Sequence, residues 1–502
     1  MKKGACLLLV LVLFVSSLTG CGKTAEPKKD TLTVVGALRS ENFDPTGLAA
    51  LIDPYTITAL FDRLFKFGNN AEVVPSLVES YELKEDNVTY VFHLRKNVKF
   101  HDGTDFTADD VIFNFDIYTN HPVLSYSFAN SVTSYEKIDA YTVNVTVPAP
   151  YVDLPGFLAN RIAIVPKSAY SSDTEGFAKN PVGTGAYKYV SQDSDGAVRL
   201  EANPDYFLGA PEIKNLVIKP PMESSTALVA LETGEVDLIF SVPTSLIPVI
   251  DKNDKITRIT KPSYSSMAFY IFDDGLQGDQ NLRKAIFHGI NRVGLIDIAT
   301  DGLAQESKNI MSTYAMGKYA GVTDYKGYDA ELAKEYLAKS NYVAGTEILI
   351  SCKSEDAQVA QLIQADLVAL GINMKIEQLD PNTWSSKLSK GELQINLSVF
   401  GSYGFTPTTL LPYFVSNSPM YGSHMAVTPE YEAVINEFLN EKDPEKLDSL
   451  IEEALKMQYD LVNIFSLYDR VSTVAHTKQI TNISDSSAIV NACYFNEIKL
   501  AD

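Results

Sequence analysis

The chain has 502 residues, of which 45% are hydrophobic and 21% are charged, as in globular proteins that bury a large core. At about 150 residues per domain, the length predicts roughly three domains. The formal net charge is −21. An acidic surface repels phosphate backbones and anionic headgroups, so the composition argues against nucleic acid as a partner.

The N-terminus predicts a signal peptide over residues 1–20. Lys2 and Lys3 precede an apolar run at 5–15, which is too short to span a bilayer. The following "LTGC" resembles a bacterial lipobox, in which Cys21 would carry the lipid. An ordinary signal peptide with an incidental cysteine is the alternative. Residues 21–30 then form a lipid-anchored tether, and the protein faces the extracytoplasmic side of the cell membrane.

The cysteines predict neither a zinc framework nor a redox pair. Cys6 leaves with the signal peptide and Cys21 carries the lipid, so Cys352 and Cys493 remain, far apart in the sequence. No CxxC occurs. Both are therefore expected to be buried free thiols.

The first half of the chain switches between strand and helix periodicity. "TYVFHLR" at 89–95 and "YTVNVTV" at 141–147 alternate as half-buried strands do. The segment 107–120 predicts a helix with Thr107 as N-cap and an acid three residues later, a capping-box pattern.

The second half repeats a helix followed by a strand. Residues 223–240 predict a helix that stops at Gly234 and a strand after it. Residues 354–379 predict a helix capped by Ser354 and ended by Gly371, before another strand. Strands and helices that alternate with short connections favour α/β lobes.

The stretch 93–111 is rich in His and Asp, which raises the question of catalysis. Asp109 and Asp110 fall in the first turn of the predicted helix, where the helix dipole favours carboxylates. His101 precedes the turn dipeptide Asp102-Gly103. The chain has no HExxH, GxSxG, GxGxxG or phosphate loop. We therefore predict no catalytic residues, no enzyme and no cofactor.

Seven segments resemble, in the family's order, the peptide/nickel family of solute-binding lipoproteins that serve ABC importers (extracellular solute-binding protein family 5). The first of them begins "VVPSLVESYELKEDN". Together they cover nearly all of the chain after the signal peptide. They are residues 73–116, 180–190, 200–218, 227–238, 281–297, 328–345 and 363–393.

The resemblance implies a type II periplasmic-binding-protein-like fold of the cluster with an extra domain: two α/β lobes, joined by two crossover segments, that close on a ligand in the cleft between them. The crossovers are expected near 262–270 and 470–478. The implied boundaries are a signal peptide at 1–20, a tether at 21–30, a first-lobe core at 31–58, 181–262 and 476–502, an extra domain of that lobe at 59–180, and a second lobe at 263–475.

The resemblance also implies ligand-binding residues. In the loop 38–45, Arg39, Ser40 and Glu41 are available as polar contacts; an ordinary surface loop is the alternative. A metal role is implied for one further residue only: His424, in "MYGSHMAV", matches a nickel-ligating histidine of nickel-type relatives, although the spacing is several residues longer.

The loop 398–411 is the third region of the implied cleft, with Phe400, Gly401, Ser402 and Tyr403 as ligand-binding residues. Peptide binders of the family usually place an Asp here, which pairs with the peptide α-amino group. Alignment on Pro407 puts Tyr403 at that position, and a phenol offers only a hydroxyl and a ring face. Phe400 falls where many relatives have Trp.

We therefore predict a lipoprotein receptor of an ABC importer, monomeric, that captures peptides or peptide-sized solutes without chemistry. It delivers them to the permease and ATPase subunits of the importer. A receptor for a nickel chelate is the alternative within the family. An extracytoplasmic hydrolase and a signalling receptor that serves no transporter are alternatives of other classes.

Overall fold

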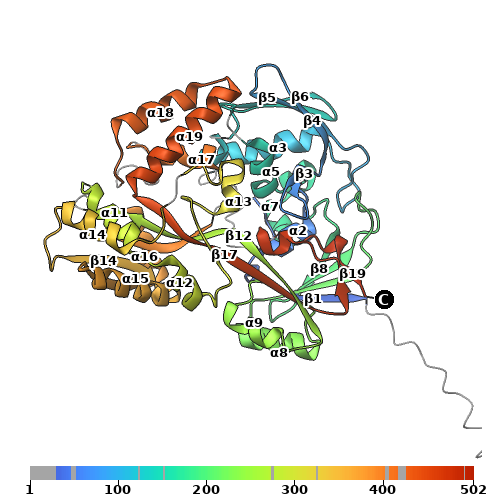
Figure 1. Cartoon of the computed structure of the whole chain (residues 1–502). Coiled ribbons are helices and arrows are strands. Elements are labelled where there is room, and N and C mark those ends of the chain that lie inside the picture. Colours follow the sequence, from blue (N-terminus) through green and yellow to red (C-terminus); the bar gives the residue numbers. More distant parts are fainter. Residues whose placement is uncertain are drawn as a thin grey trace, which may run out of the picture.

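The computed structural model describes residues 30–46, 52–121, 125–129, 131–150, 153–272, 276, 278–323, 326–401, 406–416, 425–490 and 492–501. A mixed sheet runs through both lobes and carries helices on its two faces (Figure 1). Its strand order is β15 (Asn373–Leu379), β14 (Glu347–Lys353), β16 (Ile395–Gly401), β12 (Ile256–Ile271), β17 (Ile464–Thr477), β11 (Leu238–Ile239), β1 (Thr31–Val35), β10 (Asn215–Lys219), β9 (Val198–Ala202) and β8 (Tyr187–Gln192), with β13 (Gln305–Glu306) paired to β17.

The first lobe forms around β1 because alternate residues of this strand point to opposite faces of the sheet. Leu32 and Val34 pack in one core with Tyr55 of α2 (Pro54–Leu60). Val35 packs on the other face with Leu231 of α8 (Ser224–Thr233). The short α9 (Ile247–Ile250) follows on that face.

A second layer of the first lobe is built on a four-stranded antiparallel sheet in the order β4-β5-β7-β6. Phe92, Phe115 and Leu158 share its core. The predicted N-cap Thr107 is confirmed, with a capping box to Asp110. The elements of this layer are β2 (Phe65–Phe67), β3 (Val73–Pro75), β4 (Val78–Leu83), β5 (Thr89–Leu94), α3 (Ala108–Asn120), α4 (Ser125–Ala129), β6 (Ser134–Asp139), β7 (Thr142–Thr146), α5 (Leu154–Arg161), α6 (Lys167–Ser172) and α7 (Thr174–Phe177).

The second lobe has a separate core on each face of its sheet. Phe269 of β12 packs on one face, and its neighbour Tyr270 packs on the other. The first core is closed by α11 (Gln280–Gly289), α12 (Arg292–Ala299), α14 (Ala330–Lys339) and α15 (Ala357–Leu370), and the second by α13 (Thr313–Met316), α16 (Pro381–Ser389), α17 (Pro407–Leu410), α18 (Pro429–Asn440) and α19 (Pro444–Leu461).

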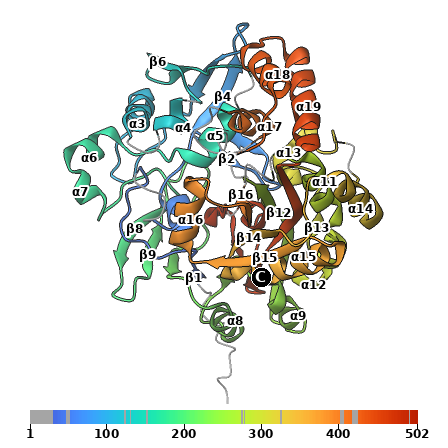
Figure 2. The same cartoon turned by 90° about the vertical axis from the view of Figure 1, so that its left-hand side faces the viewer.

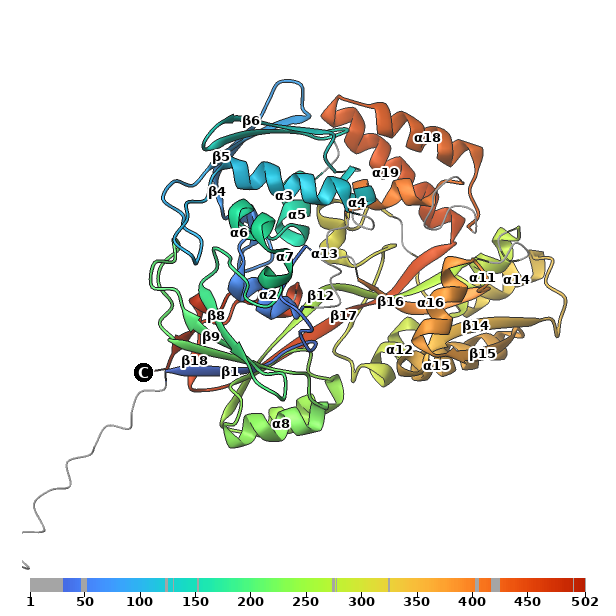
Figure 3. The same ribbon diagram turned by 180° about the vertical axis from the view of Figure 1, so that it is seen from behind.

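The two long strands β12 and β17 pair with each other and cross from one lobe to the other (Figure 3). Their register shifts between Pro262 and Ser266, near the middle of the crossing. Viewed along the molecule, α8, α9, α12 and α15 lie below the sheet, while α3, α5, α18 and α19 lie above it (Figure 2). The chain ends in β18 (Ile480–Thr481), α20 (Ser486–Ile489) and β19 (Lys499–Leu500). The domain boundaries drawn from the resemblance stay a prediction.

Most of the expected elements are confirmed, and one cap is wrong. Gly234 and Gly371 end their helices with left-handed φ values of 75° and 99°. Ser354 does not cap α15: residues 354–356 form a 3-10 turn, and the helix begins at Ala357 with no side-chain cap. Ser354 therefore lies two residues before the N-cap position, Asp356, and not at the position whose side chain can accept from the first free N–H groups of the helix.

The two remaining cysteines are free and buried, as predicted. Cys352 packs in a second-lobe core, while Cys493 packs in a first-lobe core. No bridge therefore ties the lobes together through these residues.

Candidate ligand-binding cleft

A cavity of about 280 Å³ lies on the face of the crossing strands that carries α5, α13 and α17. Three parts of the chain line it: Phe67 and Asp153 from the outer layer of the first lobe, Tyr264 from β12, and Tyr314 and Tyr319 from the second lobe. Ligand pockets usually hold about 300–1,000 Å³, so this cavity suits a small ligand. Movement of one lobe against the other would change the distance between its walls.

The walls of the cavity are mainly aromatic and aliphatic. The rings of Tyr264 and Tyr314 stack with centroids 5.7 Å apart and planes 26° apart. Burial raises the pKa of Tyr264, and the charge of Asp153 adds to the rise. The Tyr264 hydroxyl is therefore un-ionised at neutral pH. Paired aromatic faces of this kind accept apolar groups and cations.

Asp153 is the carboxylate of this cavity among the residues described. It is the N-cap of α5, and its Oδ1 accepts a hydrogen bond from the N–H of Gly156 at 3.0 Å. The residue is exposed, yet burial raises the pKa of its carboxyl group, while the hydrogen bond from Gly156 opposes the rise. Asp153 also lines the cavity, so part of its surface faces the opposite wall.

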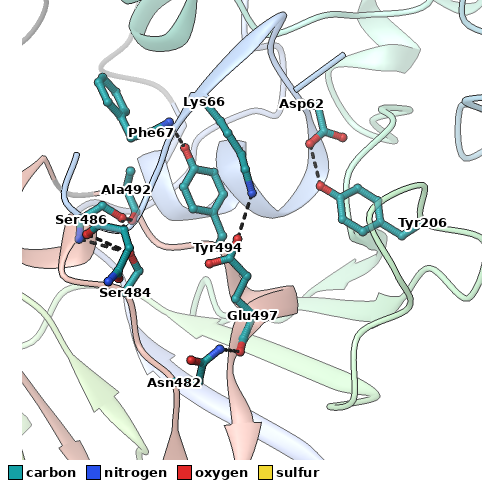
Figure 4. Close-up of polar contacts among 11 residues, drawn as sticks. Asp62, Lys66, Phe67, Tyr206, Asn482, Ser484, Ser486, Ala492, Tyr494 and Glu497 are labelled. Carbon is teal, nitrogen blue, oxygen red and sulfur yellow. Dashed lines mark hydrogen bonds and ion pairs between the residues drawn. The ribbon is translucent and has the colours of Figure 1, made fainter. Parts of the chain in front are cut away.

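The first-lobe wall is fixed to the C-terminal segment of the chain (Figure 4). The Phe67 N–H donates to the Tyr494 hydroxyl at 2.9 Å, and Lys66 forms an ion pair with Glu497 at 2.9 Å. The Tyr206 hydroxyl donates to Asp62 at 2.8 Å on the same side. These contacts position Phe67 at the cavity.

A second cavity, of about 400 Å³, lies on the opposite face of the crossing strands. Its walls come from residues 241–244 of the first lobe, residues 355–359 of the second, and β12 and β17. Arg470, Glu355 and Asp356 are its charged residues in the part of the chain that is described. Burial, with a contribution from Glu355, raises the pKa of Asp356 to about 6, although Lys353 and Arg470 oppose the rise.

The three residues predicted from the loop 38–45 do not line the aromatic cavity. The Arg39 guanidinium donates to the backbone oxygen of Asp195 at 2.8 Å. Ser40 is buried, and its hydroxyl accepts from the Asp53 N–H at 3.0 Å. Glu41 is exposed. Arg39 and Ser40 thus have contacts within the first lobe, and a ligand role for all three stays a prediction.

The predicted aromatic wall at Phe400 belongs to a core. Phe400 is 8% exposed and meets Tyr270 nearly edge-on, with centroids 6.3 Å apart. Gly401 ends β16 opposite Ser265 and is exposed. Ser402, Tyr403, His424 and Cys21 lie outside the described residues, so their roles also stay predictions.

The His- and Asp-rich stretch 93–111 makes contacts that stabilise the fold. His101 Nε2 lies 2.9 Å from the Gly185 carbonyl oxygen, and the Gly183 N–H donates to its Nδ1 at 3.3 Å. Burial lowers the pKa of His101 to about 4. Asp109 forms an exposed ion pair with Lys137. Within the described ranges, no three His, Cys, Asp or Glu residues gather closely enough to hold a metal ion.

The sequence alone gave no reason to select Asp153, Tyr264 or Tyr314. Asp153 precedes "LPG", a pattern that predicts a helix start, and a capping Asp looks the same whether or not it faces a cleft. Tyr264 and Tyr314 are fifty residues apart in the sequence, and they meet only because a strand and a helix fold together. An aromatic pair at that separation carries no local signal.

Residues 72–422 match the family described as bacterial extracellular solute-binding proteins, family 5 Middle. The match spans well over half of the chain. The chain belongs to this family. Its relatives are substrate-binding proteins and not enzymes, in agreement with the absence of catalytic motifs from the sequence.

Two curated relatives illustrate the range of ligands. The glutathione-binding protein GsiB of Pectobacterium atrosepticum is 25% identical over 479 residues, which are 90% of this chain and 91% of that protein. Heme-binding protein A of Haemophilus influenzae is 24% identical over 432 residues, 79% of each chain.

Solved structures share the two-lobed fold. The ABC transporter substrate-binding protein CtaP from Listeria monocytogenes has a TM-score of 0.82 at 19% identity, over 95% of this chain and all of that one. DppA from Helicobacter pylori, in complex with the peptide STSA, has a TM-score of 0.76 at 23% identity, over 94% and 98%. NikZ from Campylobacter jejuni, in complex with Ni(L-His), has a TM-score of 0.75 at 20% identity, over 91% and 96%.

Among the described residues, no helix has the length and apolarity that crossing a membrane requires. The family places its members outside the cytoplasm.

Proposed function

We propose that this protein is the lipid-anchored receptor of an ABC importer that captures peptides or peptide-sized solutes between its lobes and delivers them to a permease. The observation that carries the proposal is the aromatic cavity whose walls come from both lobes and from a crossing strand. A ligand that touches all three would hold the lobes together. Such closure is the form that a permease can distinguish from the open one.

The chemistry of the cavity supports a peptide over a fully apolar solute. Aromatic faces at Tyr264, Tyr314 and Phe67 suit side chains and the flat amide groups of a peptide. The carboxylate of Asp153, which lines the cavity, suits a group of positive charge. DppA, which shares the fold, was solved with a peptide bound.

The nickel-chelate alternative rests on His424 and on the shared fold with NikZ, which was solved with Ni(L-His). Calorimetry with a peptide pool, and with nickel plus free histidine, separates the two ligands. Peptide binding by the wild type, with little change in His424→Ala, is expected. Tyr403→Ala is expected to weaken it by about 1–3 kcal/mol through loss of ring contact and a hydrogen bond. Heat from nickel–histidine that disappears in His424→Ala would replace the peptide proposal with the nickel one.

The membrane anchor is proposed to be lipid on Cys21, from the lipobox-like "LTGC". Cys21→Ala is expected to release the protein from the membrane fraction, because lipid on Cys21 is the proposed attachment. Cys6→Ala, in the same signal segment, is the matched control. Retention of the Cys21→Ala protein at the wild-type level would refute the lipid anchor.

A further inference from the structure

The charges that line the aromatic cavity do not cancel. Two charged side chains lie in its wall as described, Asp153 and Lys318. Lys318 has its own partner, because its Nζ lies 2.5 Å from Oδ2 of Asp448. No Lys or Arg in the described part of the chain pairs with Asp153. Among its described residues, the cavity therefore presents one carboxylate without a cationic partner, Asp153.

The geometry of Asp153 leaves one oxygen available. Its Oδ1 accepts from the Gly156 N–H, which fixes the side chain at the start of α5. Glycine at 156 keeps the space around the other oxygen clear, since a Cβ there would lie 2.1 Å from Asp153 Oδ2. The carboxylate is thus held in place by the fold, and no described residue donates a hydrogen bond to its Oδ2.

The surroundings of Asp153 favour a cation over water. Its charge contributes to the raised pKa of Tyr90, which reaches about 12 and is chiefly due to burial, and to that of Tyr264. Both phenols therefore lie near the carboxylate. A ligand cation at this position would interact both with the charge of the carboxylate and with the negative faces of the rings. Tyr264 and Tyr314 supply two such faces in contact.

We propose that Asp153 is the acceptor for a primary ammonium group of the ligand. In a peptide this group is the α-ammonium or the end of a lysine side chain. The assignment deepens the proposed function and rests on it. The contact would also explain why the two lobes close. The ammonium would be held by Asp153 of the first lobe while the rest of the ligand packs on Tyr314 of the second lobe.

The chain contains a matched control for this residue. Asp173 caps α7 as Asp153 caps α5, with its Oδ1 accepting from the Gly176 N–H at 2.8 Å. A Cβ at Gly176 would also lie 2.1 Å from the Asp173 Oδ2. Asp173 is exposed and lies outside the cavity wall. Asparagine caps helices about as well as aspartate, so Asp153→Asn and Asp173→Asn both keep the cap and remove only a charge.

The test is calorimetry of wild type, Asp153→Asn and Asp173→Asn with three sets of short peptides: free amino terminus, N-acetylated, and N-acetylated with an internal lysine. Thermal unfolding and circular dichroism establish that each variant is folded. Asp153→Asn is expected to lower the affinity for peptides that carry an ammonium group by at least about thirtyfold. Asp173→Asn is expected to lower it by less than threefold. N-acetylation of the peptide should by itself weaken its binding to the wild-type protein, and this comparison needs no variant.

The outcomes test the role of Asp153 separately from the proposed receptor function. If Asp153→Asn loses affinity only for peptides with a free amino terminus, the group bound by Asp153 is the α-ammonium. If it also loses affinity for the N-acetylated peptides with an internal lysine, the lysine side chain can bind there. Both results support an ammonium at Asp153. Peptides that bind the wild type and Asp153→Asn within threefold of each other would overturn the inference and leave the receptor function standing. A wild-type protein that binds none of the peptides would overturn the proposed function, and this assignment with it.

Discussion

Lys318 Nζ lies 2.5 Å from Asp448 Oδ2, and the hydroxyl of Tyr319 donates to the other oxygen of the same carboxylate at 2.6 Å. This pair cancels the one positive charge described in the wall of the aromatic cavity. The cavity therefore keeps the negative sign of Asp153.

Asp448→Asn is predicted to weaken binding of ammonium-bearing peptides roughly two- to fivefold at low salt, because Lys318 would then repel the ligand cation. The effect is small since the Lys318 side chain is 65% exposed, and it should shrink at high salt. Calorimetry at two salt concentrations measures it. Asp251→Asn, which breaks an exposed ion pair with Arg258 outside this cavity, is the control. Equal or tighter binding in Asp448→Asn would argue against a cation in the cavity.

Gly156→Ala is predicted to displace the Asp153 carboxylate, because the new Cβ would overlap its Oδ2. Loss of the cap should reduce stability by about 1 kcal/mol. Affinity for ammonium-bearing peptides should fall about tenfold. Gly176→Ala makes the same overlap with Asp173 on an exposed helix, so it should lose similar stability and keep its affinity. If both variants lose affinity alike, the position of Asp153 does not matter for binding.

Asp356→Asn is predicted to stabilise the protein at neutral pH. The folded pKa of Asp356, about 6, lies above its ordinary value of 3.8, so the folded state favours the protonated form. The stability from this group is therefore complete below pH ~4 and is lost as pH rises through about 6. After allowance for solvent in the adjoining cavity, the gain at pH ~7.5 is on the order of 1–2 kcal/mol.

Urea unfolding of wild type and Asp356→Asn at several pH values measures this difference. The two curves should converge below pH ~4, separate as pH rises from ~4 to ~6, and run parallel above that. A constant difference across the range would mean that Asp356 does not titrate in this window. Asp380→Asn, at an exposed helix cap, is a control that keeps its cap.

His101→Ala is predicted to cost stability and to spare ligand binding. It removes the hydrogen bonds to the backbone at Gly185 and Gly183, which are worth about 1–3 kcal/mol when a buried partner is left unpaired. Asp109→Asn breaks only an exposed ion pair and should change stability little. Affinity should stay within about threefold, below ~0.7 kcal/mol, in both. A hundredfold loss with an intact fold would place this stretch in the binding site.

The elements with strong local signals could be predicted from the sequence. Thr107 with its capping box, and Gly234 and Gly371 at left-handed helix ends, obey rules that act within one turn. The predicted cap at Ser354 was wrong because the same residues in sequence can begin either a 3-10 turn or an α-helix. The two-lobed fold followed from the resemblance, whereas no local pattern contains the order of strands across the sheet.

The cavity could not be predicted in the same way. Its walls meet only in the folded protein, and its charge balance depends on Asp448, which lies 130 residues from Lys318. Of the residues chosen from the resemblance that the structure describes, Ser40 and Arg39 make first-lobe contacts and Phe400 lies in a core, and their ligand roles stay predictions. Which side chains surround the cavity depends on how distant segments pack together. Sequence periodicity carries no information on that packing.

The most direct test of the account is native mass spectrometry of the protein released gently from its own host membrane, because a closed cleft retains its ligand. We predict a bound peptide of a few residues that carries a free ammonium group, identified by fragmentation after release. A retained ligand with the isotope pattern of nickel, or a solute with no positive charge, would contradict it.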